Sequence, residues 1–239
     1  MFHGERFLAK PFSGDGDVPP AVRLAVEEEL GRFLDLNGSR LPEKTQNLLS
    51  ELALMVASWG SGMNLSGYRD PVSVMRSLVC DALGLWFSVQ KRHGLEGVAR
   101  VSDLGSGAGF PGLPLAILEP SLEVVLVESR ERRHHFQRAV RRSLNLTNVD
   151  PHLGRIEEIS PLSSDLVVAQ ALASPPVALA MGLPWLKEGG LLLIPGNDPG
   201  LDPGSHPLIR ESGTLGYNVL GRSEQRWLWW GRSRVEKDL

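Results

Sequence analysis

Three closely spaced glycines could bring the backbone against a nucleotide-like ligand. They lie in the segment Asp103–Gly112, where Gly105, Gly107 and Gly109 have the spacing G-x-G-x-G. Glycine lets a chain turn sharply and approach a ligand closely. Dinucleotide-binding loops use G-x-G-x-x-G instead, which seats a pyrophosphate on a helix N-terminus. The spacing here favours a ligand without phosphates, and a tight turn that binds nothing is the alternative.

A carboxylate follows the next apolar run along the chain. Val124–Val127 is continuously apolar, as in a strand that is buried on both faces, and Glu128 comes directly after it. A carboxylate there can accept hydrogen bonds from both ribose hydroxyls, or it can lie at the positive end of the helix that follows. Loop and acid together predict a nucleoside cofactor. Two cofactors stay open. One is S-adenosylmethionine, whose amino acid tail would be held by the loop and by Asp103, and the other is a nicotinamide dinucleotide.

The elements around these residues alternate between strands and helices. We expect strands at 98–104, 124–127, 149–153, 165–169 and 191–195, and helices at 112–118, 129–144 and 175–186. This alternation is typical of a doubly wound α/β sheet. The segments 214–220 and 226–230 are expected to add an antiparallel edge.

Helical patterns precede this region. Apolar residues recur at helical spacing over 21–36 and 42–58, and Asp70 before Pro71 predicts the start of a third helix that runs through Leu85. Prolines and glycines are dense before Ala21. We therefore expect an irregular leader over residues 1–20, a helical segment over 21–96 and an α/β domain over 97–239.

The composition is that of a globular protein. The chain has 239 residues, 42% hydrophobic and 22% charged, with a net charge of −3, so any nucleic acid would have to meet a local basic patch. The single Cys80 forms no disulfide within the chain, and residues 1–10 lack the apolar core of a secretory signal. We expect a cytoplasmic monomer without a membrane span.

A longer set of motifs resembles the RsmG (GidB) family. The segment 103–115 reads DLGSGAGFPGLPL, which is far more specific than three glycines. Further matches occur in the family's order between Pro42 and Gly196, at Asn64-Leu65-Ser66, Arg69-Asp70-Pro71, Arg76, Asp81, Val127-Glu128-Ser129, Asn145–Val149 and Gly154–Glu158.

The resemblance implies a Rossmann-like class I methyltransferase that uses S-adenosylmethionine to methylate N7 of a guanine in 16S rRNA, with the small ribosomal subunit as partner. Residues 97–239 would then be the methyltransferase domain. Because guanine N7 has a free lone pair, positioning and electrostatics suffice and we assign no catalytic residue. The expected cofactor residues are Asp103, Gly105, Gly107, Gly109, Phe110, Glu128, Ile156, Glu157 and Gln170.

Three positions depart from the family pattern. Gln170 stands where the family has arginine, Pro195 where it has lysine, and Ser77 where it has histidine. Two alternatives therefore stay open: a divergent member that binds RNA or the ribosome without catalysis, and one that methylates another substrate. A nicotinamide-dependent oxidoreductase is disfavoured by the glycine spacing and by the resemblance.

Other groups have a functional and a plainer interpretation. The residues Arg130, Arg132, Arg133, His134, His135, Arg138, Arg141 and Arg142 could track an RNA backbone or form a solvated helix face, which is more common. The C-terminal tryptophans could stack on RNA bases, with arginines nearby to bind phosphates, or they could be buried in a strand. We favour burial. The residues are Trp227, Trp229 and Trp230, with Arg222, Arg226, Arg232 and Arg234. We expect Cys80 to be a small buried apolar group, and His134 and His135 to bind no metal.

Overall fold

The computed structural model describes residues 18–60, 65, 67–221 and 225–235. The prediction of an irregular leader therefore falls mostly outside the described residues. The same is true of Asn64 and Ser66 in the motif set and of Arg222 in the C-terminal basic group.

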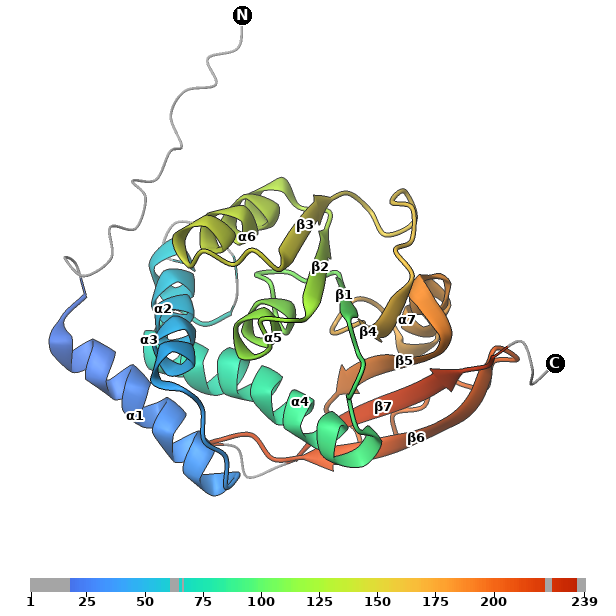
Figure 1. The fold of residues 1–239 in the computed structure, drawn as a ribbon, viewed down its shortest axis with the longest axis horizontal. Helices are drawn as coiled ribbons and strands as arrows, with labels where there is room; N and C mark the ends of the chain where they lie inside the picture. The colour runs from blue at the N-terminus through green and yellow to red at the C-terminus, as the bar shows by residue number, and fades with distance from the viewer. Residues whose placement is uncertain (1–17, 61–64, 66, 222–224, 236–239) are drawn as a thin grey trace, which may run out of the picture.

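A seven-stranded sheet forms the centre of the fold, with the strand order β3-β2-β1-β4-β5-β7-β6 (Figure 1). The parallel strands are β1 Arg100–Leu104, β2 Glu123–Glu128, β3 Val149–Leu153, β4 Ser164–Val168 and β5 Leu186–Gly196. The strands β6 Ile209–Tyr217 and β7 Arg226–Ser233 are antiparallel, and β7 lies between β5 and β6. The predicted doubly wound sheet with an antiparallel edge is confirmed.

Successive residues of the central strands face two different cores. In β2, Val124 and Leu126 belong to the larger core, whereas Val125 and Val127 belong to the smaller one, and all four are fully buried. The helices α5 Gly112–Leu118 and α6 Glu131–Ser143 cover the larger core, and α7 Pro175–Gly182, followed by a short 3-10 turn Leu183–Trp185, covers the smaller one. The continuous apolar run therefore encodes a strand buried on both faces, as predicted.

Within the described residues, the helices before the sheet are α1 Pro20–Leu36, α2 Glu43–Gly60, α3 Pro71–Val74 and α4 Cys80–His93, with a π-helical turn Met75–Val79 between the last two. Asp70 caps α3, because its Oδ2 accepts a hydrogen bond from the backbone N–H of Ser73 at 2.8 Å. The helix expected to run through Leu85 continues to His93.

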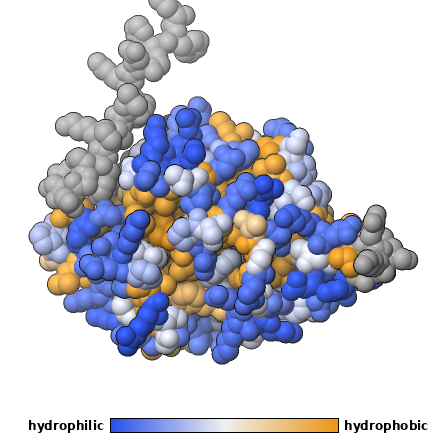
Figure 2. All heavy atoms as spheres, in the orientation of Figure 1, coloured by the Kyte–Doolittle hydropathy of each residue, from blue (hydrophilic) through white to orange (hydrophobic). Residues whose placement is uncertain are grey.

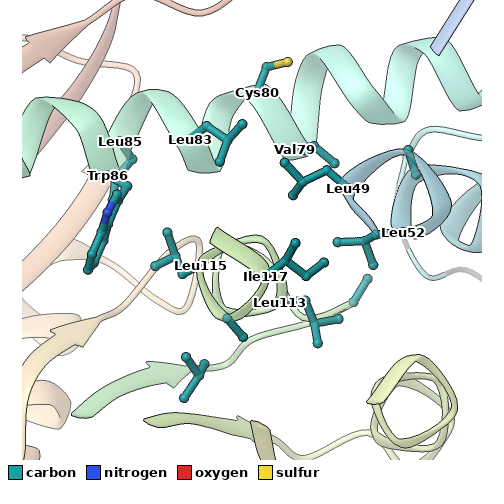
Figure 3. Packing of buried hydrophobic residues seen from close by; sticks show 14 of the residues in the cluster. Leu49, Leu52, Val79, Cys80, Leu83, Leu85, Trp86, Leu113, Leu115 and Ile117 are labelled. Atoms are coloured by element: carbon teal, nitrogen blue, oxygen red, sulfur yellow. The ribbon is translucent and has the colours of Figure 1, made fainter. Parts of the chain in front are cut away.

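The N-terminal helices brace α5. Side chains from α2, the π-helical turn, α4 and α5 meet in one layer, as Figure 3 shows for Leu49, Leu52, Val79, Leu83, Leu113, Leu115 and Ile117. All of them belong to the larger core, which also contains the apolar residues on one face of the sheet. The helical segment and the α/β domain thus share a core, and their division at residue 96 stays a prediction.

A buried ionic network joins α4 to the C-terminal strands. The hydroxyl of Tyr217 donates to Asp81 Oδ1 at 3.0 Å, and Arg226 Nε forms an ion pair with the same oxygen at 3.3 Å. Arg226 also donates to Asn197 Oδ1, in the loop after β5. Burial, followed by the charge of Asp81, raises the pKa of Tyr217. Asp81 therefore connects three parts of the fold.

Several bounds were predicted wrongly. The helix expected over 175–186 ends as α7 at Gly182, and Leu186 already belongs to a strand. β7 extends to Ser233 and not to Trp230. β5 begins at Leu186 and not at Leu191, because Leu186 pairs with Ser164 before a bulge in the ladder. β6 spans 209–217 and not 214–220, because its polar first half pairs with the end of β7. Burial of the tryptophans is confirmed for Trp229 and Trp230, whereas Trp227 is half-buried.

One helical stretch, Pro71–His93, has the length and the mean hydropathy, 1.4, that a membrane span would need. A helix was predicted here, but neither its full length nor a hydropathy in this range was expected from the sequence. Of its most apolar window, 61% is buried inside the fold, as in a core helix. Cys80 lies in this stretch and is fully buried, as expected.

Candidate functional site

The glycine-rich loop connects β1 to α5 at the carboxyl edge of the parallel strands. Gly105, Gly107 and Gly109 have φ angles of +70°, +59° and +88°, which other residues rarely adopt. A Cβ on Gly109 would lie 2.3 Å from Leu113 Cδ1, and one on Gly105 would lie 2.6 Å from Leu172 Cδ1. A Cβ on Gly107 would meet no side-chain atom nearer than Arg133 Nη1, which would lie 3.8 Å away. Gly107 is therefore the glycine with open space beside it.

Asp103 holds the two ends of this loop together. Its Oδ2 accepts a hydrogen bond from the backbone N–H of Gly112 at 2.9 Å. The side chain is buried, and its Oδ1 is enclosed without a hydrogen-bond partner among the described residues. Burial, together with the charge of Glu128, raises the pKa of Asp103 to about 7. Asp103 thus fixes the loop, and its expected contact with an amino acid tail stays a prediction.

Gln137 on α6 also holds the loop, and the sequence analysis missed it. Its Nε2 donates to Ser106 Oγ and to Gly107 O, both at 2.8 Å, and the side chain is fully buried. Ser106 is in turn fixed by its own backbone N–H, which donates to Val127 O at 3.0 Å. The available signal was an uncharged polar residue next to Phe136 on the apolar side of a charged helix.

Glu128 lies beside the loop, at the end of the strand that pairs with β1. Its Oε1 accepts from the backbone N–H of Arg130 at 2.7 Å, which is the helix-end role considered above. Its Oε2 is 3.6 Å from Arg133 Nη1. The carboxylate is only 4% exposed. The hydrogen bond to Oε1 thus orients the carboxylate of Glu128, and the expected contact with the ribose would use Oε2.

The remaining predicted residues follow neighbouring strands. Ile156 is half-buried against the smaller core, and Glu157 is exposed, with its Oε2 3.9 Å from Arg155 Nε. Gln170 is half-buried just after β4, and Phe110 packs against the larger core. Because β1 to β4 are parallel, the loops that carry these residues meet at one edge of the sheet. Their contacts with a cofactor stay predictions.

The positions that depart from the family pattern lie in different environments. Pro195 is buried in β5 opposite Leu228, so it presents no polar group. Ser77 is half-buried in the π-helical turn. A cation is nevertheless present at the loop, because Arg133 Nη1 lies 3.6 Å from Glu128 Oε2 and 3.8 Å from the position that a Cβ on Gly107 would take.

A cavity of about 350 Å³ lies at the opposite edge of the sheet. Residues before β1 and at the starts of β4 and β5 line it, including His93, Val98, Asp165 and Leu191. Ligands of doubly wound sheets bind at the carboxyl ends of the strands. This cavity is therefore separate from the candidate cofactor site.

Comparison with known proteins identifies the family. The family model described as "GidB: rRNA small subunit methyltransferase G" matches residues 45–197. The chain belongs to this family. It is 32% identical over 211 residues to ribosomal RNA small subunit methyltransferase G of Deinococcus radiodurans, covering 85% of this chain and 80% of that protein. The protein of the same name from Sorangium cellulosum is 37% identical, with 74% of each chain covered.

Coverage varies among the relatives of this family member. The Rubrobacter xylanophilus protein of the same name is 34% identical, and the match covers 71% of this chain but 65% of that one. Among solved structures, an O-methyltransferase from Bacillus cereus in complex with SAH aligns with a TM-score of 0.57 at 15% identity, covering 87% of this chain and 100% of that chain. A putative O-methyltransferase from Klebsiella pneumoniae aligns with a TM-score of 0.56 at 13% identity. The alignment covers 88% of this chain and 97% of that chain. The Rossmann-like class I methyltransferase fold is confirmed.

Proposed function

We propose that the protein transfers the methyl group of S-adenosylmethionine to N7 of a guanine in 16S rRNA, acting as a cytoplasmic monomer on the small ribosomal subunit. Membership of the rRNA small subunit methyltransferase G family supports the reaction and the class of RNA. The observation that carries the site is the glycine loop, fixed by Asp103 and Gln137, with the carboxylate of Glu128 beside it.

The chemistry of these residues fits the cofactor. Backbone groups around Gly107 are the donors and acceptors available to its amino acid tail, and Glu128 Oε2 is an acceptor for ribose hydroxyls. Ile156 offers an apolar surface for the adenine, and Glu157 an acceptor near its polar edge. Phe110, Gly105, Gly109 and Gln170 would complete the lining. Residues 97–239 would supply the methyltransferase domain and 21–96 the helical segment that packs on it.

When bound, the cofactor supplies a methyl group on a sulfonium, which a lone pair can attack directly. Guanine N7 carries such a lone pair, so no proton has to be removed before transfer. The work of the protein is then to orient the purine and to exclude water. A site built from a glycine loop and the carboxylate of Glu128 beside it is suited to this positioning role, and the proposed transfer needs no general base.

The departures at Gln170 and Pro195 favour a second candidate, a family member that binds RNA or the ribosome without catalysis. Two cationic side chains of the family pattern are replaced by an amide and by a buried proline. Arg133 is the side chain that can compensate, because it lies at the glycine loop.

The two candidates differ in one experiment. The wild-type chain and the variant Glu128→Gln are incubated with labelled S-adenosylmethionine and small ribosomal subunits that lack the modification. Label at guanine N7 with the wild type, and little with E128Q, is the expected result. Subunit binding without label would favour the second candidate. Label at another atom or on another RNA would refute the assignment of N7 or of 16S rRNA.

A further inference from the structure

Five arginines on α6 and at its N-cap have side chains without an acidic partner in the described part of the chain. They are exposed, and no ion pair or side-chain hydrogen bond to a described residue involves them: Arg130, Arg132, Arg138, Arg141 and Arg142. The sixth arginine of the set, Arg133, lies against Glu128. The helix thus carries a cluster of uncompensated positive charge.

Arginines elsewhere in the fold are commonly paired. Ion pairs join Arg23 to Glu51, Arg76 to Glu29, Arg100 to Glu123, Arg226 to Asp81 and Arg232 to Glu211. Single free cations such as Arg40 occur elsewhere in the described chain, and it is the clustering of free arginines that distinguishes α6.

Helix stability does not explain the cluster. Arg141 and Arg142 lie in the last turn, where the helix dipole favours cations, but Arg130 and Arg132 lie at the opposite end, where it disfavours them. Arg138 and Arg142 are four residues apart, a spacing at which like charges repel. The one acid on α6, Glu131, lies 3.8 Å from His135. An external anion would relieve this repulsion.

The position of α6 connects the cluster to the cofactor site. The helix follows Glu128 directly, and its buried side holds the glycine loop through Gln137. Its thirteen residues extend for about 20 Å away from that edge. Figure 2 shows strongly hydrophilic residues over α6, which lies at the upper side of the same view in Figure 1. The basic surface therefore begins beside the expected site of methyl transfer.

We propose that these five arginines, the α6 basic surface, bind the phosphate backbone of the substrate RNA and orient it toward the cofactor site. The identity of the RNA rests on the proposed function. A backbone that repeats its charges along one direction matches arginines distributed along a helix. Residues 130–142 hold six arginines and one glutamate, whereas the whole chain has a net charge of −3. The rest of the molecule is thus net negative and disfavours other approaches.

The test compares two double variants that each remove two positive charges. R138Q/R142Q removes two of the five charges of the α6 basic surface. R40Q/K91Q is the matched control, because Arg40 and Lys91 are exposed and have no partner among the described residues. For each protein the Kd for unmodified small subunits is measured over a range of salt concentrations, together with the KM for subunits and the Kd for S-adenosylmethionine.

R138Q/R142Q is expected to raise the Kd and the KM for subunits about tenfold and to reduce the salt slope by roughly 1.4–2. The Kd for S-adenosylmethionine should not change, and R40Q/K91Q should resemble the wild type. Equal subunit Kd values and salt slopes for the two double variants would overturn the proposal. If the wild type binds subunits through α6 but transfers no methyl group, the proposed function fails and the α6 basic surface stands.

Discussion

The side-chain amide of Gln137 donates a hydrogen bond to the carbonyl of Gly107 at 2.8 Å from a fully buried position. This contact joins α6 to the one glycine of the loop that has open space beside it. The same amide nitrogen also donates to Ser106 Oγ. The conformation of the candidate cofactor loop therefore depends on a helix outside the glycine motif.

Replacing Gln137 by methionine removes both donated hydrogen bonds and keeps the length of the side chain. The free energy of unfolding should fall by about 1–3 kcal/mol, because buried acceptors lose their partner. The Kd for S-adenosylmethionine should rise about tenfold, as 1.4 kcal/mol of loop ordering would produce. Gln46→Met is the control, since Gln46 Nε2 donates to Leu41 O, at 2.8 Å, outside the loop. Equal Kd values for Q137M and Q46M would show that Gln137 does not position the cofactor loop.

Gly107→Ala tests where the ligand approaches. The positive φ should cost about 1 kcal/mol of stability, and the new methyl group meets no backbone or side chain within 3.4 Å. We expect a folded protein whose Kd for S-adenosylmethionine, measured by calorimetry, is at least tenfold higher, because the methyl group fills the space beside the loop. An unchanged Kd would mean that the ligand does not contact the loop at Gly107.

Asp103→Asn should change the pH dependence of stability. The pKa of Asp103 is about 7 in the folded protein, against an ordinary value of 3.8. The folded state therefore holds a proton that the unfolded chain releases above pH 4, and this contribution to stability is lost as the pH rises through 7. The free energy of unfolding of the wild type relative to D103N should fall by roughly 2–4 kcal/mol between pH 4.5 and 8. Denaturant titrations would measure it, and a constant difference across this range contradicts the raised pKa.

Asp81→Asn separates a structural role from a ligand-binding one. The substitution leaves the buried guanidinium of Arg226 without its carboxylate, so the free energy of unfolding should fall by about 3 kcal/mol or more. Tyr217→Phe removes one hydrogen bond of the same network and should cost about 1 kcal/mol. Neither variant should change the Kd for S-adenosylmethionine at a temperature where it is folded. Weaker cofactor binding by D81N with wild-type stability would place Asp81 in the binding site instead.

The strands that could be predicted are those whose own residues show an apolar pattern typical of a buried strand. The run from Val124 to Val127 indicates a strand covered on both faces, and the structure has it so. The start of β5 could not be predicted, because Lys187 and Glu188 are polar. This part of the strand is held by the pairing of Leu186 with Ser164 on β4 and by contacts such as the hydrogen bond that Ser233 Oγ donates to Lys187 O. Such pairing depends on distant residues that no local pattern contains.

The residues of the candidate site also fall into those that a local sequence pattern predicts and those that depend on packing between distant segments. The glycines and Glu128 were predictable, because positive φ and a carboxylate after a buried strand restrict the residue type. Gln137 was not, because its role arises only when α6 packs against the loop. The enclosure of Asp103 was also not predicted, since it depends on α5 starting directly above the carboxylate.

The network around Asp81 also has a consequence for biosynthesis. Its hydrogen-bond partner Tyr217 lies 136 residues further along the chain, and Arg226 comes later still. The first helices leave the ribosome long before either group exists, so the carboxylate of Asp81 lacks these two partners until β6 and β7 have been translated. The final packing of the earliest segment is thus completed by the last strand, and a chain that stops before β7 would be unstable at its beginning as well as at its end.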